Sequence, residues 1–347
     1  MSNARNDLKI SLITTVLNEE ESLSGWIESV QRQTVRPDEI VVVDGGSNDQ
    51  TVGMLRRMRI DCPVRVLERQ GCNISEGRNI AISEARHDVI AVTDAGTLLD
   101  ESWLEAITEP LTSAQVDVVG GFFRPAGRNW FEKILAAIIV PQLAEIDGKS
   151  FLPSSRSVAF RREAWHAAGG YPERLMTCED LVFDLALRDR GSVFVFAPSA
   201  SVLWYPRRTM AAFMRQYYGY ARGDGQADLW RRRHAARYGA YSVGLLLAGM
   251  CRRNRVTVLP LAAGFCVYQA KFSKRLWGVR PFESVVKMLF ATAFAPLVVV
   301  GGDVAKMLGY PRGLRERRQM MRNDQGIMEG DRRAKDSYMY SGPRSEI

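Results

Sequence analysis

The stretch EIVVVDGGSNDQT, Glu39–Thr51, decides the fold class of this chain. Its first part, Ile40–Val43, is a continuous β-branched run, which predicts a strand buried on both faces, as in a parallel sheet. The run stops at Asp44, and the Gly, Ser, Asn and Asp residues that follow favour a turn and a helix cap. Asp44 is therefore expected at the carboxyl end of a parallel strand, where open α/β sheets bind ligands. Ordinary turn chemistry would favour the same residues, so a purely structural role stays open.

Strands and helices alternate around that stretch. Lys9–Leu17 predicts an apolar strand, Ser22–Gln33 predicts an amphipathic helix, and Val64–Glu68 predicts a further strand. Asp88–Val92 predicts another, which leads into Asp94. Alternation of this kind implies a mostly parallel sheet flanked by helices. A second buried strand thus brings a second carboxylate to the same edge of the sheet.

Composition narrows the class of protein and its partners. The chain has 347 residues, 46% of them hydrophobic and 25% charged, which is an ordinary globular balance for one or two domains. A net charge of +8 favours anionic partners such as nucleotides and lipid head groups. The basic clusters lie beside apolar runs rather than on a polar aromatic face, which argues against nucleic-acid binding. Five cysteines without CxxC spacing indicate neither a disulfide framework nor a zinc site.

Four segments carry one shared pattern in a fixed order. They are ISLITTVLNEEESL (Ile10–Leu23), EIVVVDGGSNDQT (Glu39–Thr51), GRNIAISEARHDVIAVTDAGTLLDESWL (Gly77–Leu104) and TCEDLVFDLALRDRG (Thr177–Gly191). Together they resemble glycosyltransferase family 2. The resemblance implies an α/β fold with a GT-A-type, Rossmann-like sheet. It also implies a hexosyltransferase that uses a nucleotide-sugar donor.

The same resemblance implies residues that bind the donor. It puts Thr15 and Asp44 near the uracil and ribose of a UDP-sugar, and Arg78 near the base or the phosphates. Related enzymes carry a QxxRW motif that meets the diphosphate, but this chain has no Arg-Trp after its Gln216. Arg215 and Arg222 are therefore the expected cations for the leaving diphosphate, because guanidinium groups bind phosphate well. For Arg215, a solvated basic helix face is the alternative.

The resemblance leaves the use of a metal in question. Asp94 stands where the family's DxD motif begins, so it is the candidate ligand for Mg²⁺ or Mn²⁺. The motif's last acid, normally the direct ligand, is Gly96 here, and this change removes a carboxylate that would hold the ion. A second acid that the family usually places after the position of Asp44 is Gly45. We therefore expect weak or unusual metal dependence.

Glu179 and Asp180 open a predicted helix that ends by Gly191. Inverting transfer needs a base for the acceptor hydroxyl, and the dipole of a helix keeps a carboxylate at its amino terminus ionised. The resemblance matches Asp180 to the family's base and gives Glu179 a role in positioning the acceptor. A favourable acidic first turn would place the same pair there without catalysis.

Other stretches predict further elements. Asp117–Arg124, Ser192–Ala197 and Val202–Pro206 predict strands, and Thr209–Arg222 predicts a helix. Trp130–Ile146 is apolar beyond a single stripe, so it forms either a core helix or a surface for a lipid-linked acceptor, and the core is favoured.

The last third changes in composition. Three apolar runs, Tyr238–Cys251, Val256–Ala270 and Met288–Gly302, are each shorter than the ~18 residues of a membrane-spanning helix. Basic and aromatic residues flank them, as at a membrane interface. We expect a transferase domain over residues 1–230, a membrane-associated helical region over 231–310 and a disordered charged tail over 311–347.

The combined prediction is an inverting glycosyltransferase of cell-envelope polysaccharide biosynthesis. It would move a sugar from a UDP-sugar to a lipid-linked or growing polysaccharide acceptor at the cell membrane. The amino terminus, MSNARNDLKI, has no signal-like apolar core, so we expect the catalytic domain on the cytoplasmic side. Two alternatives stay open. One is a polysaccharide synthase, although three short runs are few for a channel, and the other is a catalytically altered nucleotide-sugar-binding or scaffold protein.

Overall fold

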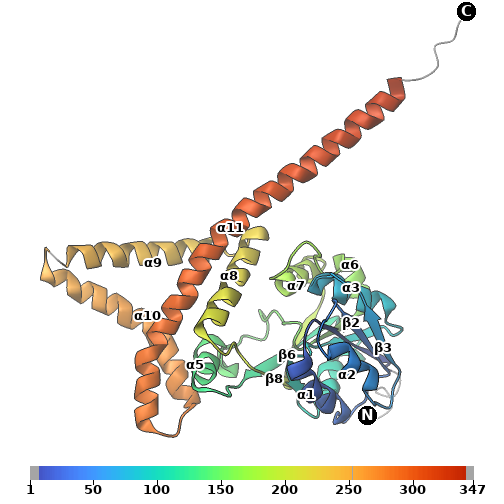
Figure 1. Ribbon diagram of the computed structural model, residues 1–347, viewed down its shortest axis with the longest axis horizontal. Helices are drawn as coiled ribbons and strands as arrows, with labels where there is room; N and C mark the ends of the chain where they lie inside the picture. Colours follow the sequence, from blue (N-terminus) through green and yellow to red (C-terminus); the bar gives the residue numbers. More distant parts are fainter. Residues whose placement is uncertain (1–7, 252, 341–347) are drawn as a thin grey trace, which may run out of the picture.

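The computed structural model describes the backbone of residues 8–251 and 253–340, with side chains up to Arg322. Figure 1 shows two regions: an α/β region that contains the amino-terminal half, and a helical region from which α9 (Arg231–Met250) and α11 (Val285–Tyr340) project. Both regions contribute to the site, because helices of the helical region lie against loops of the α/β region.

One sheet of eight strands organises the α/β region, in the order β3-β2-β1-β4-β7-β6-β8-β5. Strands β3, β2, β1 and β4 are mutually parallel, as expected, whereas β7 runs antiparallel to β4 and β6, and β5 runs antiparallel to β8. The strands are β1 (Ile10–Val16), β2 (Glu39–Asp44), β3 (Val64–Glu68), β4 (Val89–Val92), β5 (Thr97–Leu99), β6 (Val118–Pro125), β7 (Val158–Arg161) and β8 (Phe194–Trp204).

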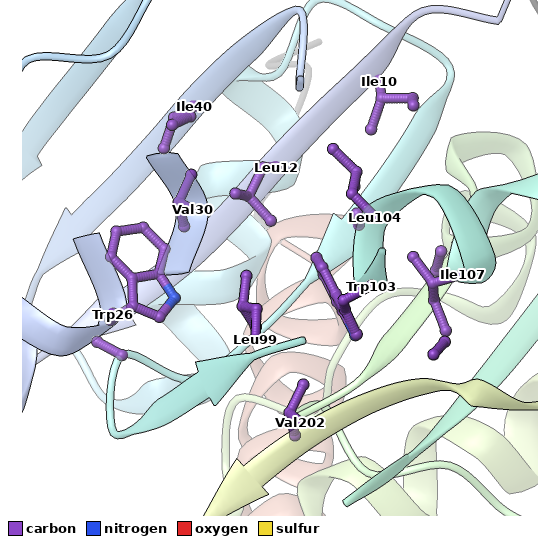
Figure 2. Close-up of a cluster of buried hydrophobic side chains, with 14 of the residues drawn as sticks. Ile10, Leu12, Trp26, Val30, Ile40, Leu99, Trp103, Leu104, Ile107 and Val202 are labelled. Carbon is purple, nitrogen blue, oxygen red and sulfur yellow. The ribbon is translucent and has the colours of Figure 1, made fainter. Parts of the chain in front are cut away.

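Each face of the sheet buries its own apolar layer. Side chains alternate along a strand, so Val42 of β2 packs into one layer and its neighbour Val43 into the other. The first layer, drawn in Figure 2, receives Trp26 from α1 and Trp103 from α4. The second is covered by α3, α6 and α7. The flanking helices are α1 (Glu20–Gln31), α2 (Thr51–Arg57), α3 (Ile74–Glu84), α4 (Trp103–Thr108), α6 (Arg162–Ala168) and α7 (Glu179–Asp189).

The structure corrects part of the expected strand pattern. The two strands expected over Ser192–Ala197 and Val202–Pro206 are a single strand, β8, which pairs with β6 on both sides of a register shift between Gly120 and Phe122. The irregularity at this shift interrupts the pairing without ending either strand. Strands β5 and β7 were not expected, because both are short and neither has a clear alternating pattern.

The helical region has a third apolar core. Ile134, Leu135 and Ile138 of α5 (Trp130–Ile139) are buried there together with Phe213 of α8 (Met210–Gln226) and Val298 of α11. The core interpretation of the first half of Trp130–Ile146 is therefore confirmed, and α5 ends just before Pro141. Helix α10 (Val258–Val279) also packs on α5 and forms a hairpin with α9 in Figure 1.

Helices α8 and α11 pack so closely that their backbones nearly touch. A Cβ added at Gly309 would lie 2.3 Å from the Tyr218 carbonyl oxygen, and one added at Gly313 would lie 1.9 Å from that of Arg222. Small residues four positions apart permit such an approach between helices. The predicted boundary at residue 230 thus separates two helices that pack on each other.

The expected disordered tail differs from the structure. Helix α11 continues through Pro311 to Tyr340, and residues 311–322 include Glu316, which is paired with Arg222 of α8. Packing against α8 supplies a stabilisation that composition alone does not indicate. The last part of the predicted tail, residues 341–347, lies outside the described residues. By length and composition, Val285–Arg322 of α11 could cross a membrane, and a third of its most apolar window is buried in the protein.

Candidate active site

The candidate site lies where β1, β2 and β4 end. The parallel register pairs Val16 with Asp44 and Ile13 with Val92, so the loops after these strands meet at one edge of the sheet. Helix α3 reaches the same edge. Asn73 caps its amino terminus through a capping box with Glu76, and Gly77 lets it approach β1, because a Cβ there would lie 2.9 Å from Thr15 Cγ2.

Arg78 of α3 is the centre of the site. Its Nη1 donates to Glu179 Oε1 and Asp180 Oδ1, each at 2.9 Å, and its Nη2 donates to Asp94 Oδ1 at 2.9 Å. The guanidinium lies 5.3 Å from the centre of the Tyr171 ring, and the side chain is only 2% exposed. A single buried cation thus joins the end of β4 to the start of α7. The structure brings together four of the predicted site residues.

The two carboxyl groups at the start of α7 have pKa values shifted in opposite directions. Burial, reinforced by the charge of Asp180, raises the pKa of Glu179 to about 7, although Arg78 opposes this shift. Burial would also raise the pKa of Asp180, but the Arg78 charge and a hydrogen bond from Ser155 outweigh it and hold that pKa below its usual value. Neighbouring acids whose pKa values are pushed apart can take different roles in one reaction.

Asp180 is fixed by the loop before β7. Ser155 donates its hydroxyl to Asp180 Oδ1 at 2.5 Å and its backbone N–H to Oδ2 at 3.2 Å, and Ser154 Oγ lies 3.3 Å from Oδ2. The Ser155 hydroxyl also lies 2.9 Å from the hydroxyl of Tyr171. Sequence reasoning missed both serines and Tyr171. The Gly169-Gly170-Tyr171 turn before α7 was the signal that could have indicated Tyr171.

The loop that opens α7 rests on α8. Cys178, just before Glu179, has a left-handed backbone with φ of 66°, a conformation that non-glycine residues rarely adopt. Thr177 donates its hydroxyl to the Gly219 carbonyl at 2.8 Å, and a Cβ at Gly223 would lie 2.4 Å from Thr177 Oγ1. Because α8 packs against α11 on another face, it connects the loop that opens α7 to the helical region.

Thr15 and Asp44 lie at the same edge of the sheet, beside the Arg78 network. The Asp44 carboxylate accepts hydrogen bonds from the Gly46 N–H at 2.9 Å, the Ser47 N–H at 3.0 Å and the Ser47 hydroxyl at 2.5 Å. Asp44 as a whole residue is only 2% exposed. Asp44 therefore stabilises its own turn, which is the structural role left open by its sequence.

Gly45, the first departure from the family pattern, is in close contact with a neighbouring loop. A Cβ at Gly45 would lie 3.1 Å from the Cys72 carbonyl oxygen, and the Gly45 carbonyl accepts from the Gly71 N–H at 2.9 Å. The loop between β3 and α3 thus occupies the space next to this position. An acidic side chain there would require that loop to move.

The described carboxylates near Asp94 do not by themselves form a divalent-cation site. Asp94 Oδ1 is bonded to Arg78, and Oδ2 lies 3.9 Å from Nε of a second guanidinium, that of Arg156. The nearest atom to a Cβ at Gly96 would be Glu19 Oε2, 3.9 Å away, and burial raises the pKa of Glu19. In residues 8–251 and 253–322, no three His, Cys, Asp or Glu side chains are grouped to hold an ion. Mg²⁺ and Mn²⁺ prefer several free oxygen ligands, which this arrangement lacks.

Arg222 is not brought to the site. Its Nε donates to Glu316 Oε2 of α11 at 2.6 Å, and Gln226 donates to the same oxygen at 2.9 Å. The sequence could not indicate this pair, because we expected Glu316 to lie in a disordered tail. Arg222 thus joins α8 to α11.

Comparisons with known proteins agree with this fold. Residues 11–168 match the family model described as Glycosyl transferase family 2. The chain is 27% identical over 233 residues to the succinoglycan biosynthesis protein ExoA of Rhizobium meliloti, a match covering 64% of this chain and 70% of that protein. It is 26% identical over 156 residues to the undecaprenyl-phosphate 4-deoxy-4-formamido-L-arabinose transferase of Serratia proteamaculans, covering 43% of this chain and 48% of that relative.

A solved structure is similar over most of the chain. The mannosyltransferase PcManGT of Pyrobaculum calidifontis, solved with GDP-Man and Mn²⁺, superposes with a TM-score of 0.52 over 88% of this chain and 86% of its own, at 17% identity. This similarity shows a GT-A-like fold. Residues 11–168 therefore lie in a glycosyltransferase family 2 domain, and the chain that carries it is a glycosyltransferase.

Proposed function

We propose that this glycosyltransferase inverts the anomeric carbon as it moves a sugar from a UDP-sugar to a lipid-linked or growing polysaccharide acceptor. One observation carries the proposal: the guanidinium of Arg78 links Asp180 at the start of α7 to Asp94 at the end of β4. A carboxylate suited to an acceptor hydroxyl thereby lies next to the sheet edge where a donor nucleotide would bind.

Asp180 serves as the general base. As the acceptor oxygen forms its bond to the anomeric carbon, the bond from that carbon to the β-phosphate oxygen breaks and leaves its electron pair on the diphosphate. The hydroxyl proton passes to Asp180, whose low pKa keeps it ionised beforehand. Glu179, with a pKa raised to about 7, positions the acceptor from the same helix turn.

Thr15 and Asp44 contact the nucleoside in this proposal. Both are at the ends of parallel strands that meet at the same edge. Asp44 is buried and bonded to its own turn, so its contact with the ribose requires that turn to open. The fold neighbour solved with GDP-Man supports a nucleotide-sugar donor in general. UDP is the first nucleotide to test, followed by GDP and dTDP. No step is assigned to a metal.

A lipid-linked acceptor is supported by the names of the relatives and by the helical region. One relative is named as an undecaprenyl-phosphate transferase and another as a succinoglycan biosynthesis protein. Between α5 and α11 lies an open cavity of about 420 Å³, lined by Trp130, Phe290, Ala293, Phe294 and Lys287. Apolar walls beside one amine suit a hydrocarbon chain that carries an anionic group.

We propose further that the helical region lies on the cytoplasmic face of the cell membrane. Leu246 of α9, Leu259 of α10 and Phe290 of α11 are 64%, 70% and 66% exposed. Such exposed apolar side chains are typical of membrane or partner surfaces. Helix α11 packs its other face on α5 and α8, and α8 carries charged residues that would be costly inside a bilayer. An interfacial position accommodates both faces.

The test is a transfer assay with full-length protein in detergent. UDP-, GDP- and dTDP-sugars are incubated with and without a bacterial membrane lipid extract, and nucleoside diphosphate release is measured. Release that depends on the extract and is lost in Asp180→Asn is the expected result. Binding of a nucleotide sugar without acceptor-dependent release would instead indicate a binding or scaffold protein.

A further inference from the structure

Arg156 is a second guanidinium at the sheet edge. It lies in the loop before β7, two residues beyond the Val92–Val158 pair, so the antiparallel register continues it opposite Asp94. Its Cζ is 5.5 Å from the Phe123 ring centre and 5.1 Å from that of Trp204, and its side chain is 21% exposed. Packing beside two aromatic rings limits the motion of a long side chain, so little conformational entropy remains to be lost on binding a ligand.

Polar contacts orient the Arg156 side chain further. Its Nη1 donates to Ser154 Oγ at 2.9 Å, and the Tyr220 side chain of α8 lies near it. Its Nε is 3.9 Å from Asp94 Oδ2, a distance that gives attraction without a hydrogen bond. A guanidinium has five N–H donors, so these contacts leave it capacity to bind a planar pair of phosphate oxygens.

Two other arginines considered for this role are occupied, and a third, Arg215, is exposed on α8. Arg78 serves three carboxylates, and Arg222 is paired with Glu316 on α11. The described carboxylates around Asp94 do not by themselves hold a divalent ion. A departing nucleoside diphosphate nevertheless develops negative charge that a nearby cation must stabilise.

We propose that Arg156 binds the diphosphate of the donor and stabilises its charge as the sugar leaves. The ligand class is a nucleoside diphosphate or its sugar ester. Arg156 thereby supplies at this edge the positive charge that a metal ion would otherwise provide. The inference rests on the proposed nucleotide-sugar function and adds the residue that recognises its diphosphate.

Nucleotide binding in EDTA tests the role of Arg156. UDP, GDP and dTDP, each beside its monophosphate, are titrated calorimetrically into full-length wild type, Arg156→Met and Arg156→Lys. For the nucleotide that binds, Arg156→Met should weaken diphosphate binding about 10- to 100-fold, because a charge-assisted hydrogen bond is lost. Monophosphate binding should weaken far less. Arg156→Lys keeps the charge without the planar fork, so it should recover part of the loss even if the Met variant folds poorly.

Arg188→Met is the matched control. Arg188 also stacks on an aromatic ring, 5.2 Å from the centre of Phe194, but it donates to the Phe151 carbonyl near the far end of α7. Arg188→Met should leave diphosphate binding unchanged. An equal loss for di- and monophosphate in Arg156→Met, or none, would overturn the role of Arg156.

A Mn²⁺ arm tests the competing explanation. If Mn²⁺ tightened diphosphate binding more than tenfold and Glu19→Gln removed that gain, Glu19 would supply the carboxylate that Gly96 lacks, and the proposal would be wrong. Failure of the proposed transfer reaction can be distinguished from failure of the Arg156 proposal. Arg156-dependent diphosphate binding without acceptor-dependent release would refute the proposed reaction and leave the binding role of Arg156 intact.

Discussion

The sheet edge and the helical region differ in the kind of side chain that they bury. At the sheet edge, Arg78 binds carboxylates from positions up to 102 residues away, and the result is a buried cluster of one cation and three carboxyl groups. In the helical region, α11 buries one apolar face against α5 and α8 and leaves Val286 and Phe290 exposed. The first arrangement fixes groups for chemistry, and the second leaves a surface for a further apolar contact. Helix α8 touches both.

The largest expected effect comes from removing the cation of the sheet edge. Arg78→Met leaves Asp94, Glu179 and Asp180 without their shared partner, so we expect a loss of about 3–5 kcal/mol in the free energy of unfolding near neutral pH. Transfer should be abolished as well. Urea unfolding of the full chain, followed by tryptophan fluorescence, measures the loss.

Arg36→Met is the control for that prediction. Arg36 pairs with Asp61 on the surface, where both side chains are at least half exposed, so its loss should cost less than about 1 kcal/mol. If Arg78→Met were no more destabilising than Arg36→Met, the buried cluster would not hold the fold together.

The next effect tests the packing between α8 and α11. Gly313→Ala must push the helices apart, because its Cβ would lie 1.9 Å from the Arg222 carbonyl oxygen, whereas Gly249 of α9 has no atom within 4 Å of the same position. We expect Gly313→Ala to cost about 1–3 kcal/mol and Gly249→Ala to gain up to about 1 kcal/mol. Thermal unfolding compares the two variants. Equal effects would contradict the close packing.

Membrane binding should depend on the helical region alone. Val286 of α11 is 60% exposed and Val193 of the α/β region is 48% exposed, so Val→Glu at either position should leave the fold intact. Val286→Glu removes one valine side chain from the lipid contact, so its binding to anionic vesicles should be roughly tenfold weaker than that of wild type. Val193→Glu should bind as wild type. Co-sedimentation with vesicles measures both, and equal binding would locate the membrane contact elsewhere.

The last comparison is a pH dependence of stability. The pKa of Glu179 is about 7 in the folded protein against 4.5 as the ordinary value, so the folded state holds this proton more tightly. Its contribution to stability is therefore full below about pH 4.5 and is lost as pH rises towards 7. Relative to wild type, Glu179→Gln should gain stability between pH 5 and 8, while the exposed Glu101→Gln should show no such trend. A stability difference between Glu179→Gln and wild type that does not change with pH would contradict the raised pKa of Glu179.

Local sequence patterns were enough to predict the parallel strands and the start of α7. β-branched runs that stop at Asp44 and beside Asp94, and an acidic pair before an amphipathic run, are signals contained within a few residues. Non-local pairing was not predictable. The Arg78 network joins positions 16 to 102 residues apart, and Arg156 reaches Asp94 only through the antiparallel register of β4 and β7.

The helical region was harder to predict for a related reason. Gly309 and Gly313 signal close helix packing only once α8 is known to lie opposite them. Without that partner, the charged composition after Pro311 favoured disorder, and Arg222 remained a candidate for the diphosphate. The pair formed by Arg222 and Glu316 accounts for both differences.

The central claim is that Asp180, held beside Arg78, takes the acceptor proton. The most direct measurement is the single-turnover rate of sugar transfer by Asp180→Asn, with donor affinity measured in parallel and with Asp189→Asn, at the other end of α7, as the control. We predict a rate about 10²–10⁴-fold below wild type with donor affinity nearly unchanged, and a normal rate in the control. Transfer by Asp180→Asn at close to the wild-type rate would show that another group accepts the proton.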